Sequence, residues 1–367
     1  MSDTLCEENQ GVRAWRDPES GILWHYQALT GPQGTPTGAK IIGDHWDGLV
    51  PCTAIPEETA GTLAVPTHID GLPVRVIGEG AFADCKRLER VDLPDGVVSI
   101  EREALCGCEA LRDVRIPGSV RTLGGRASWS GGVFADCPSL RTVRLPAGLT
   151  RLGAHTFDAC TALESVDLPP GLTEIGDYCF TECTALRRIV IPEGVRRIGE
   201  WAFKECKALR EVVFPRSLRV IEECAFDGCE SLRAAVLPDG VWYLGENAFD
   251  ECSSLTELRL PAGLERLRFG TFVDCSALRE VVLPEGLREI ETACFRDCTA
   301  LERVTFPASL RIIGRLAFYN DDALRCPTFP EGLERIDEAA FPGTEAFRDV
   351  TLPPDCLCDS SAFGDDA

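Results

Sequence analysis

The stretch Ile198–Val220, which reads IGEWAFKECKALREVVFPRSLRV, decides the fold because the chain repeats it. The next copy is Ile221–Tyr243, IEECAFDGCESLRAAVLPDGVWY, and the copy before it is Ile175–Arg197, IGDYCFTECTALRRIVIPEGVRR. The period is 23 residues, and it runs from about Ile77 to the last residues of the chain. A fixed period in this range is typical of a solenoid, in which each unit buries its apolar face against its neighbours.

Each copy predicts two short strands. The segment Leu-x-x-Val-x-Leu-Pro, as in Leu209–Pro215, alternates apolar and variable residues, which is the period of a half-buried strand. The proline ends the ladder because it has no N–H to donate. After a Pro-x-Gly turn such as Pro192–Gly194, the segment Val/Leu-x-x-Ile-Gly predicts a second short strand on another face.

The sixth position of the repeat is aromatic in every copy except the second, where Leu105 stands. Such regular recurrence indicates a core position, and truncating one of these side chains to Ala should cost roughly 3–5 kcal/mol. The aromatic residues are Phe82, Phe134, Phe157, Phe180, Phe203, Phe226, Phe249, Phe272, Phe295, Phe318 and Phe341.

The first residues of the chain do not follow the period. Two β-like runs, Gly11–Trp15 and Ile22–Tyr26, flank Asp17–Gly21, whose residues suit a tight turn, so we expect a hairpin. Ala39–Ile42 predicts a further strand. Because the open end of a solenoid exposes apolar core and a strand edge, we expect this segment to be a cap, with a separate functional module as the alternative. The predicted domains are a β-rich N-terminal cap over residues 1–64, a solenoid of about 12 repeats over residues 65–357, and a degenerate C-terminal turn and tail over residues 358–367.

The repeat pattern IGxxAFxxCxxLxxVxLPxGLxx resembles that of the BspA-like leucine-rich repeat family, a bacterial and protozoan branch of the leucine-rich repeat proteins. The lead-in Val65–Val74 is similar to the usual start of that family, and the resemblance covers about residues 62–357. It implies a curved solenoid that binds proteins, and many members are secreted or surface-attached and take part in adhesion. We therefore expect a curved, mainly β leucine-rich repeat solenoid with short helical or irregular turns and an N-terminal β-rich cap.

The composition of the chain restricts the classes of partner and the cellular location that we expect. The net charge of -22 and the pI near 4.6 argue against nucleic acid as a partner, because nucleic acid favours a basic face. No run of 18 or more apolar residues is present, so no membrane insertion is expected. The first residues, MSDTLCEENQ, lack the basic and apolar regions of a secretory signal, which predicts a cytoplasmic location. The alternative is a secreted or cell-surface protein whose signal was removed.

The 19 cysteines predict reduced thiols rather than a disulfide framework. Ten of them occupy the ninth position of the repeat, where stacking in register does not supply pairs with disulfide geometry. We expect this cysteine ladder to act as small apolar side chains in a tight turn, without metal, because structural zinc needs four convergent ligands. The ladder comprises Cys85, Cys108, Cys137, Cys160, Cys183, Cys206, Cys229, Cys252, Cys275 and Cys298.

Two charged rows accompany the ladder. The residue before the cysteine is acidic in seven of ten copies, and the residue after the leucine of the repeat is Arg in eight. One interpretation is an alternating ion-pair network on the rim, since stacked like charges repel unless countered. The other is an arginine stripe that recognises an anionic partner, or an acidic stripe that holds cations. The acidic row is Asp84, Asp136, Glu182, Glu205, Glu251, Asp274 and Asp297, and the arginine row is Arg112, Arg141, Arg187, Arg210, Arg233, Arg279, Arg325 and Arg348.

The variable positions inside the longer strand are the candidate binding surface. In the middle repeats one of them is apolar, at Val190, Val213, Val236 and Val282, with Arg259 interrupting. A valine stripe on the open face of a parallel sheet would be an exposed apolar patch, and such patches often mark partner sites. The β-propensity of valine on a solvent-facing strand is the alternative explanation.

Three aromatic residues are further candidates for contact with a partner. Trp242 and Tyr243 stand where other copies carry Arg, Glu or Thr, which suits either an interface or core packing. Trp129 lies among six extra residues, around Arg126–Gly132, that break the period in the third repeat. Insertions in solenoids form loops, often on the binding face, and a tolerated surface insertion is the alternative.

These features predict a non-enzymatic protein–protein interaction scaffold that binds a protein partner through the strand-bearing face. No catalytic, cofactor-binding or metal-ligating residue is predicted, because His155 is the only histidine in the repeats and no nucleophile or phosphate-loop motif is present. The alternatives are an adhesin-like surface protein and a carbohydrate-binding protein that stacks sugars on Trp129 and Trp242. A monomer is compatible with the pattern, and the identity of the partner stays open.

Overall fold

The computed structural model describes residues 11–32, 34–43, 53–125, 131–341 and 350–364. The chain forms two compact units, unit 1 (Met1–Leu172) and unit 2 (Thr173–Ala367). Both consist of turns of a β-solenoid, about 12 in total, which confirms the predicted fold class. Within the described ranges no helix forms, so the turns are irregular rather than helical. None of the described segments is a helix that could cross a bilayer.

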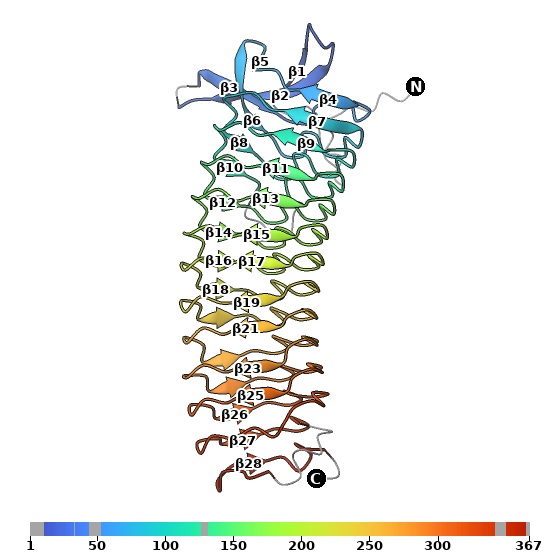
Figure 1. Ribbon diagram of the computed structural model, residues 1–367. Helices are drawn as coiled ribbons and strands as arrows, with labels where there is room; N and C mark the ends of the chain where they lie inside the picture. The colour runs from blue at the N-terminus through green and yellow to red at the C-terminus, as the bar shows by residue number, and fades with distance from the viewer. Residues whose placement is uncertain (1–10, 33, 44–52, 126–130, 342–349, 365–367) are drawn as a thin grey trace, which may run out of the picture. The chain divides into compact units, whose positions relative to one another are not determined.

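Unit 1 begins with a three-stranded antiparallel arrangement. β1 (Val12–Arg16) pairs with β2 (Leu23–Thr30), which confirms the predicted hairpin, and β2 pairs with β3 (Pro36–Ile41). β3 then runs parallel to β6 (Leu72–Ile77), so the sheet continues into the first turn of the solenoid (Figure 1). This pairing satisfies the strand edge that the first repeat would otherwise expose.

The repeats of unit 1 place their strands in two rows. One row continues the first sheet in the order β6-β8-β10, with β5 paired to β6, and the other row comprises β4-β7-β9 and β11-β13. Successive repeats pair in parallel, as where Val91 lies opposite Val114. The bounds are β4 Gly61–Ala64, β5 His68–Ile69, β7 Leu88–Asp92, β8 Ser99–Ile100, β9 Asp113–Arg115, β10 Thr122–Leu123, β11 Thr142–Arg144, β12 Arg151–Leu152 and β13 Ser165–Asp167.

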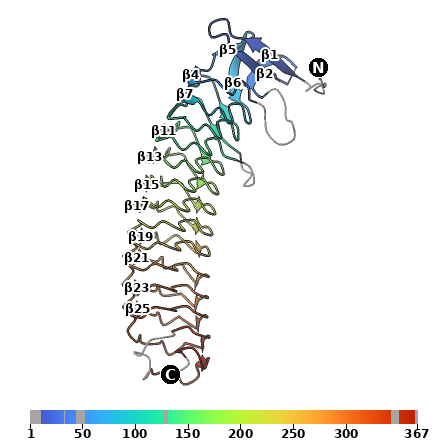
Figure 2. The ribbon, with the colours of Figure 1, turned by 90° about the vertical axis from the view of Figure 1, so that its right-hand side faces the viewer.

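Unit 2 repeats this arrangement with greater regularity. Two-residue strands form one row, in the orders β14-β16-β18-β20 and β22-β24-β26-β27-β28. Three-residue strands form the other row, β15-β17, β19-β21 and β23-β25, which we call the strand-bearing face of unit 2 (Figures 1 and 2). Val190 lies opposite Val213 and Ile198 opposite Ile221, so the register advances by one whole repeat and both predicted strands are confirmed.

The strands of unit 2 have the following bounds. They are β14 Glu174–Ile175, β15 Arg188–Val190, β16 Arg197–Ile198, β17 Glu211–Val213, β18 Val220–Ile221, β19 Ala234–Val236, β20 Tyr243–Leu244, β21 Glu257–Arg259, β22 Arg266–Leu267, β23 Glu280–Val282, β24 Glu289–Ile290, β25 Arg303–Thr305, β26 Ile312–Ile313, β27 Arg335–Ile336 and β28 Leu357–Cys358.

A stack of phenylalanine rings fills the centre of each unit. From Phe180 to Phe341 in unit 2, successive rings lie nearly parallel with centroids 4.9 to 5.7 Å apart. In unit 1 the fully buried Trp24 meets the ring of Phe82 edge-on, with 6.2 Å between centroids. These side chains are buried, which confirms the core role predicted for the aromatic position, and their ring contacts add to the burial of apolar area.

The turn between the two rows contains two residues with left-handed backbone in each regular copy. In the copy Ile198–Val220 these are Trp201, with a φ of 57°, and Glu205, with a φ of 58°. The same two positions are taken elsewhere by Gly228 and Gly270, with φ of 70° and 61°. Because Asp, Asn and Gly adopt this conformation more readily than other residues, backbone geometry contributes to the Asp and Gly content of the position before the cysteine.

Candidate functional site

The strand-bearing face of unit 2 carries an exposed row of valines, which we call the valine stripe: Val190, Val213, Val236 and Val282. Their exposed fractions are 43%, 38%, 41% and 60%. The stripe exists because successive side chains of a strand point to opposite faces, so the buried Ile189 and Val212 leave their C-terminal neighbours facing outward.

The pairing of the strands determines which residue lies opposite each valine of the stripe. Val190 lies directly opposite Val213 on paired strands, while Val236 lies opposite Arg259 and Val282 opposite Thr305. β17 and β19 also lie side by side, although no ladder joins them. Val190, Val213 and Val236 thus occupy three consecutive strands, and Val282 is separated from them by the interruption at β21.

Charged residues at the first position of these strands pair with each other across neighbouring strands. Nε of Arg188 lies 2.9 Å from Glu211, and a guanidinium nitrogen of Arg303 lies 2.7 Å from Glu280. This row therefore neutralises much of its own charge. One position earlier, three arginines are exposed and form no ion pair with any described residue. They are Arg187, Arg210 and Arg233.

The predicted network between the acidic row and the arginine row is not observed, since no ion pair among the described residues joins the two rows. Glu205 and Asp297 instead pair with nearby Lys207 and Arg296. Glu302 occupies the position of the arginine row in its own copy, between Arg279 and Arg325. Its carboxylate oxygens lie 3.6 Å from Arg279 and 3.7 Å from Arg325. The prediction failed because carboxylates of the acidic row pair with basic residues closer to them in the chain, which the spacing of the two rows did not reveal.

The aromatic candidates occupy a different row from the valines. Trp242 is 61% exposed and stands just before β20, in the row of two-residue strands. Tyr243 is half-buried, and the guanidinium of Arg268 lies 4.8 Å from its ring centroid. With Arg266 and Glu265 they line a shallow pocket of about 240 Å³. The remaining candidate, Trp129, lies outside the described residues.

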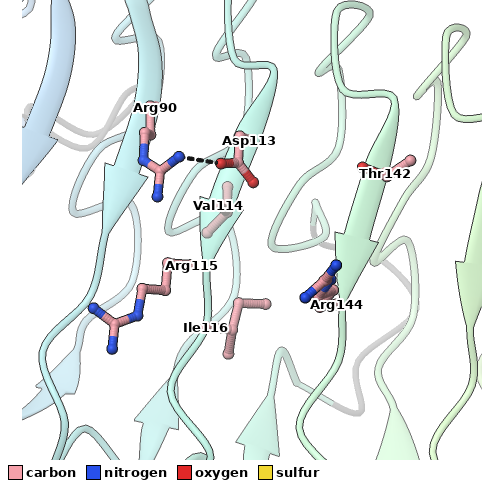
Figure 3. A pocket seen from close by; sticks show the side chains of 7 residues that line it. All are labelled: Arg90, Asp113, Val114, Arg115, Ile116, Thr142 and Arg144. Carbon is pink, nitrogen blue, oxygen red and sulfur yellow. Dashed lines mark hydrogen bonds and ion pairs between the residues drawn. The ribbon is translucent and has the colours of Figure 1, made fainter.

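Unit 1 contains a hollow lined by arginines on its own row of longer strands (Figure 3). It opens where β9 and β11 lie side by side without a hydrogen-bonded ladder, and its volume is about 560 Å³. We call it the arginine pocket, and sequence reasoning missed it. Its lining is Arg90, Asp113, Val114, Arg115, Ile116, Thr142 and Arg144.

The cysteine ladder is buried along its whole length, and every cysteine that the structure describes is free. Its thiols are also hydrogen-bond donors to backbone carbonyls of the preceding repeat. Sγ of Cys206 lies 3.1 Å from the carbonyl oxygen of Phe180, and that of Cys275 lies 3.3 Å from the carbonyl oxygen of Phe249. Burial raises the pKa of these thiols, so they stay protonated and able to donate. The described residues contain no group of three side chains suited to a metal ion.

Comparison with known families identifies the repeat. A family model of the BspA type leucine rich repeat region, in six copies, matches residues 71–128, 128–256 and 242–365. The chain belongs to the BspA-type leucine-rich repeat family. Its repeats are therefore of the kind that resemblance predicted, and proteins of the leucine-rich repeat class are generally non-enzymatic scaffolds.

Solved structures show the same fold as this BspA-type chain. A leucine-rich cell surface protein from Faecalibacterium prausnitzii is 23% identical, with a TM-score of 0.51, over 92% of this chain and 88% of that one. A leucine-rich repeat protein from Eubacterium ventriosum is 17% identical, with a TM-score of 0.52, over 96% of this chain and 95% of that one. A comparison with curated protein sequences gives no significant match.

Proposed function

We propose that this BspA-type protein is a non-enzymatic scaffold that binds a protein partner through the strand-bearing face of unit 2. The observation that supports this most directly is the valine stripe, whose members stay exposed beside charged and polar residues on the strand-bearing face. An apolar row with polar borders is the usual composition of a protein interface, in which burial of the apolar centre supplies most of the affinity.

The charges beside the stripe favour a partner with acidic residues around an apolar centre. Arg187, Arg210 and Arg233 border the stripe without ion pairs among the described residues, while the row between them and the valines is largely neutralised by pairs such as Arg188–Glu211. A partner with acidic residues at its rim would pair with the exposed arginines, which speeds association and fixes orientation more than it raises affinity.

The test is a substitution in the stripe with a matched control elsewhere. Val213→Glu places a charge in the centre of the proposed interface, where it would be buried without a partner. Val98→Glu is the control because Val98 is 42% exposed, belongs to unit 1 and lies off the strand-bearing face. A partner captured with the unaltered protein is purified, and its dissociation constant for each variant is measured by calorimetry.

We expect Val213→Glu to weaken binding at least about tenfold and Val98→Glu to change it less than about twofold. Equal affinities of the two variants would show that the captured partner uses another surface. The proposal assigns no catalytic activity to the protein. A turnover activity of the purified protein that survives Val213→Glu would therefore contradict it.

An adhesin-like role at the cell surface is the first alternative. It draws support from the likeness to the Faecalibacterium prausnitzii protein, which is described as a cell surface protein. The comparisons lend no such support to a cytoplasmic location. Protease treatment of intact cells that express the full-length gene separates the two, because only a surface protein is cleaved while the cells stay sealed.

Carbohydrate binding is the second alternative, and the exposure of Trp242 favours it. An exposed indole beside a shallow pocket with Arg266 and Glu265 offers a stacking platform and hydrogen-bonding groups for a sugar ring. A glycan array probed with the unaltered protein and with Trp242→Ala tests this. Glycan binding that disappears in Trp242→Ala but persists in Val213→Glu would favour carbohydrate over the protein partner.

A further inference from the structure

We infer that the pocket beside Trp242 in unit 2 binds the guanidinium group of an arginine side chain that belongs to a partner protein. The pocket lies on the row of two-residue strands and not on the valine stripe, so this inference goes beyond the proposed function and does not depend on it. It rests on an arrangement that other copies of the repeat complete with an arginine of their own.

In three of the copies that the structure describes, an arginine caps the turn that precedes it. Nη1 of Arg219 lies 3.0 Å from the carbonyl oxygen of Arg216 and 2.7 Å from that of Leu218. Arg121 and Arg311 donate in the same way to the two equivalent carbonyls of their own copies. The turn of this repeat is therefore able to receive a guanidinium group.

The copy that carries Trp242 leaves these two carbonyls uncapped. Trp242 stands one period after Arg219, and the carbonyl oxygens of Val241 and Asp239 accept no hydrogen bond from any residue that the structure describes. Apart from its chain neighbours, the atoms closest to a Cβ at Gly263 would be these two oxygens, at 3.4 and 3.8 Å. The equivalent glycine of the preceding copy abuts the guanidinium of Arg219 instead. The turn at Trp242 thus has acceptors where other copies have a donor in place.

The pocket opens at a break in the row of two-residue strands. β20 and β22 belong to consecutive copies but no ladder joins them, whereas the other consecutive strands of this row in the described part of unit 2 are paired. Trp242 and Glu265 line the pocket from the two sides of this break. Its volume of about 240 Å³ is below the range of about 300–1,000 Å³ for sites of drug-sized ligands, so it suits a single side chain.

Trp242 and Glu265 supply the groups that would attract a cation. The indole of Trp242 is 61% exposed, and a guanidinium that stacks on it gains a cation–π interaction. Glu265 is exposed and forms no ion pair with any residue in the described part of the chain, so its carboxylate can accept a charge-assisted hydrogen bond. Together with the two carbonyl oxygens, these groups match a guanidinium, which has five donors and no acceptor.

The two arginines that also line the pocket already have contacts within the chain. A guanidinium nitrogen of Arg266 lies 2.9 Å from Glu289, and the guanidinium of Arg268 lies over the ring of Tyr243. The pKa of Tyr243 is raised by its burial and, against the opposite effect of Arg268, by the charges of three nearby glutamates. These are Glu222, Glu223 and Glu246. The negative charge around the pocket favours a cation over a neutral sugar, and the net charge of -22 favours cationic partners in general.

The exposure of the site favours an arginine presented by a partner protein over free arginine. A single exposed guanidinium–carboxylate pair adds little affinity, because water screens it. A protein that carries the arginine adds further contacts, and the first contact raises the effective concentration of the others.

The experiment measures the binding of N-acetyl-arginine methylamide, a blocked arginine with one charge, to the full-length protein at neutral pH by saturation-transfer NMR of the ligand. The test variants are Trp242→Leu, which removes the indole without changing the charge, and Trp242→Arg, which restores the cap that Arg219 provides. The control is Phe269→Ala, because Phe269 is 42% exposed in unit 2 and does not line the pocket. Thermal melting checks that every variant is folded.

We expect the unaltered protein to bind with a dissociation constant on the order of 1 mM, and both Trp242 variants to bind at least about fivefold more weakly. Glu265→Gln should weaken binding about threefold, and Phe269→Ala should stay within about twofold. N-acetyl-lysine methylamide should bind more weakly, because a compact ammonium has no planar face to stack on the indole. Val213→Glu should leave binding of the blocked arginine unchanged, so failure of the proposed function and failure of this inference are distinguishable.

Five results would overturn the inference. The first is an absence of binding by the unaltered protein. Equal weakening in Phe269→Ala and Trp242→Leu, or equal affinities for blocked lysine and blocked arginine, would indicate diffuse attraction of cations. Free arginine that binds at least about tenfold more tightly than the blocked form would indicate an amino-acid site. Displacement of the blocked arginine by an equal concentration of a neutral methyl glycoside would indicate a carbohydrate site.

Discussion

The thiol of Cys229 donates a hydrogen bond to the carbonyl oxygen of Phe203, with 3.3 Å between sulfur and oxygen. The same carbonyl also accepts the backbone N–H of Cys206, at 3.2 Å. The ninth position of each repeat therefore requires a side chain that is small, apolar enough for a dry core and still able to donate. Cysteine meets these three needs together, which explains its recurrence better than packing alone.

The role of the thiol as a donor predicts that Cys229→Ala destabilises the protein. The substitution leaves the carbonyl of Phe203 with one partner fewer and opens a small cavity, so we expect a loss of about 1–2 kcal/mol in the free energy of unfolding. Urea denaturation followed by circular dichroism measures it. Cys224→Ala is the control, because Cys224 is only half-buried. A loss as large in the control would show that the hydrogen bond is unimportant.

The ninth position of the copy after Cys298 is occupied by Asp321 in place of cysteine. Asp321 is fully buried, neither of its carboxylate oxygens has a hydrogen-bond partner among the residues that the structure describes, and burial raises its pKa well above the ordinary value. We expect Asp321→Cys to raise the free energy of unfolding at neutral pH by about 1–3 kcal/mol, because an unsatisfied buried group is removed and a donor is restored. Asp322→Cys, at an exposed site, should leave the denaturation midpoint unchanged. Equal midpoints for the two variants would argue against the explanation.

Asp250 makes the stability of the protein depend on pH. Burial, together with the charges of Asp227, Glu251 and Asp274, raises its pKa to about 7. The folded state then binds more protons than the unfolded state between about pH 4 and pH 7, so the free energy of unfolding falls as pH rises through this window.

We expect Asp250→Asn to be more stable than the unaltered protein at about pH 8, by an amount on the order of 1 kcal/mol because solvent screens the half-exposed group, and equal to it at about pH 4. Denaturation midpoints across this range test the prediction, with Asp355→Asn, at an exposed site, as the control. A difference that does not vary with pH would show that ionisation of Asp250 is not its cause.

The phenylalanine stack predicts a contrast between two substitutions of the same kind. Phe226 is fully buried, with ring centroids 5.1 Å from both stacked neighbours, whereas Phe269 is 42% exposed. Phe226→Ala should cost about 3–5 kcal/mol, because it leaves a cavity between two rigid repeats. Phe269→Ala should cost much less. Thermal melting of both variants tests this difference. Similar melting temperatures would mean that the stack relaxes to fill the gap.

The repeat pattern was sufficient to predict the strands, the aromatic core and the burial of the cysteines. These features depend on identical positions that stack every 23 residues, so each copy supplies the environment of the next. The alternation of Ile189 and Val190 likewise predicted that the valines would point outward. The same reasoning failed for the charged rows, because the spacing does not determine which partner a long charged side chain reaches, and Glu205 pairs with Lys207 instead of an arginine of the row.

The sequence by itself determined the solenoid, its core positions and the outward direction of the valine stripe, because strand alternation and stacking follow from spacing alone. Only the tertiary structure decided which arginine pairs with which carboxylate and where two strands adjoin without a ladder. Arg90 pairs with Asp113 on the next strand, and the arginine pocket opens where β9 and β11 adjoin. Both outcomes depend on distances between different repeats, which the 23-residue period does not encode.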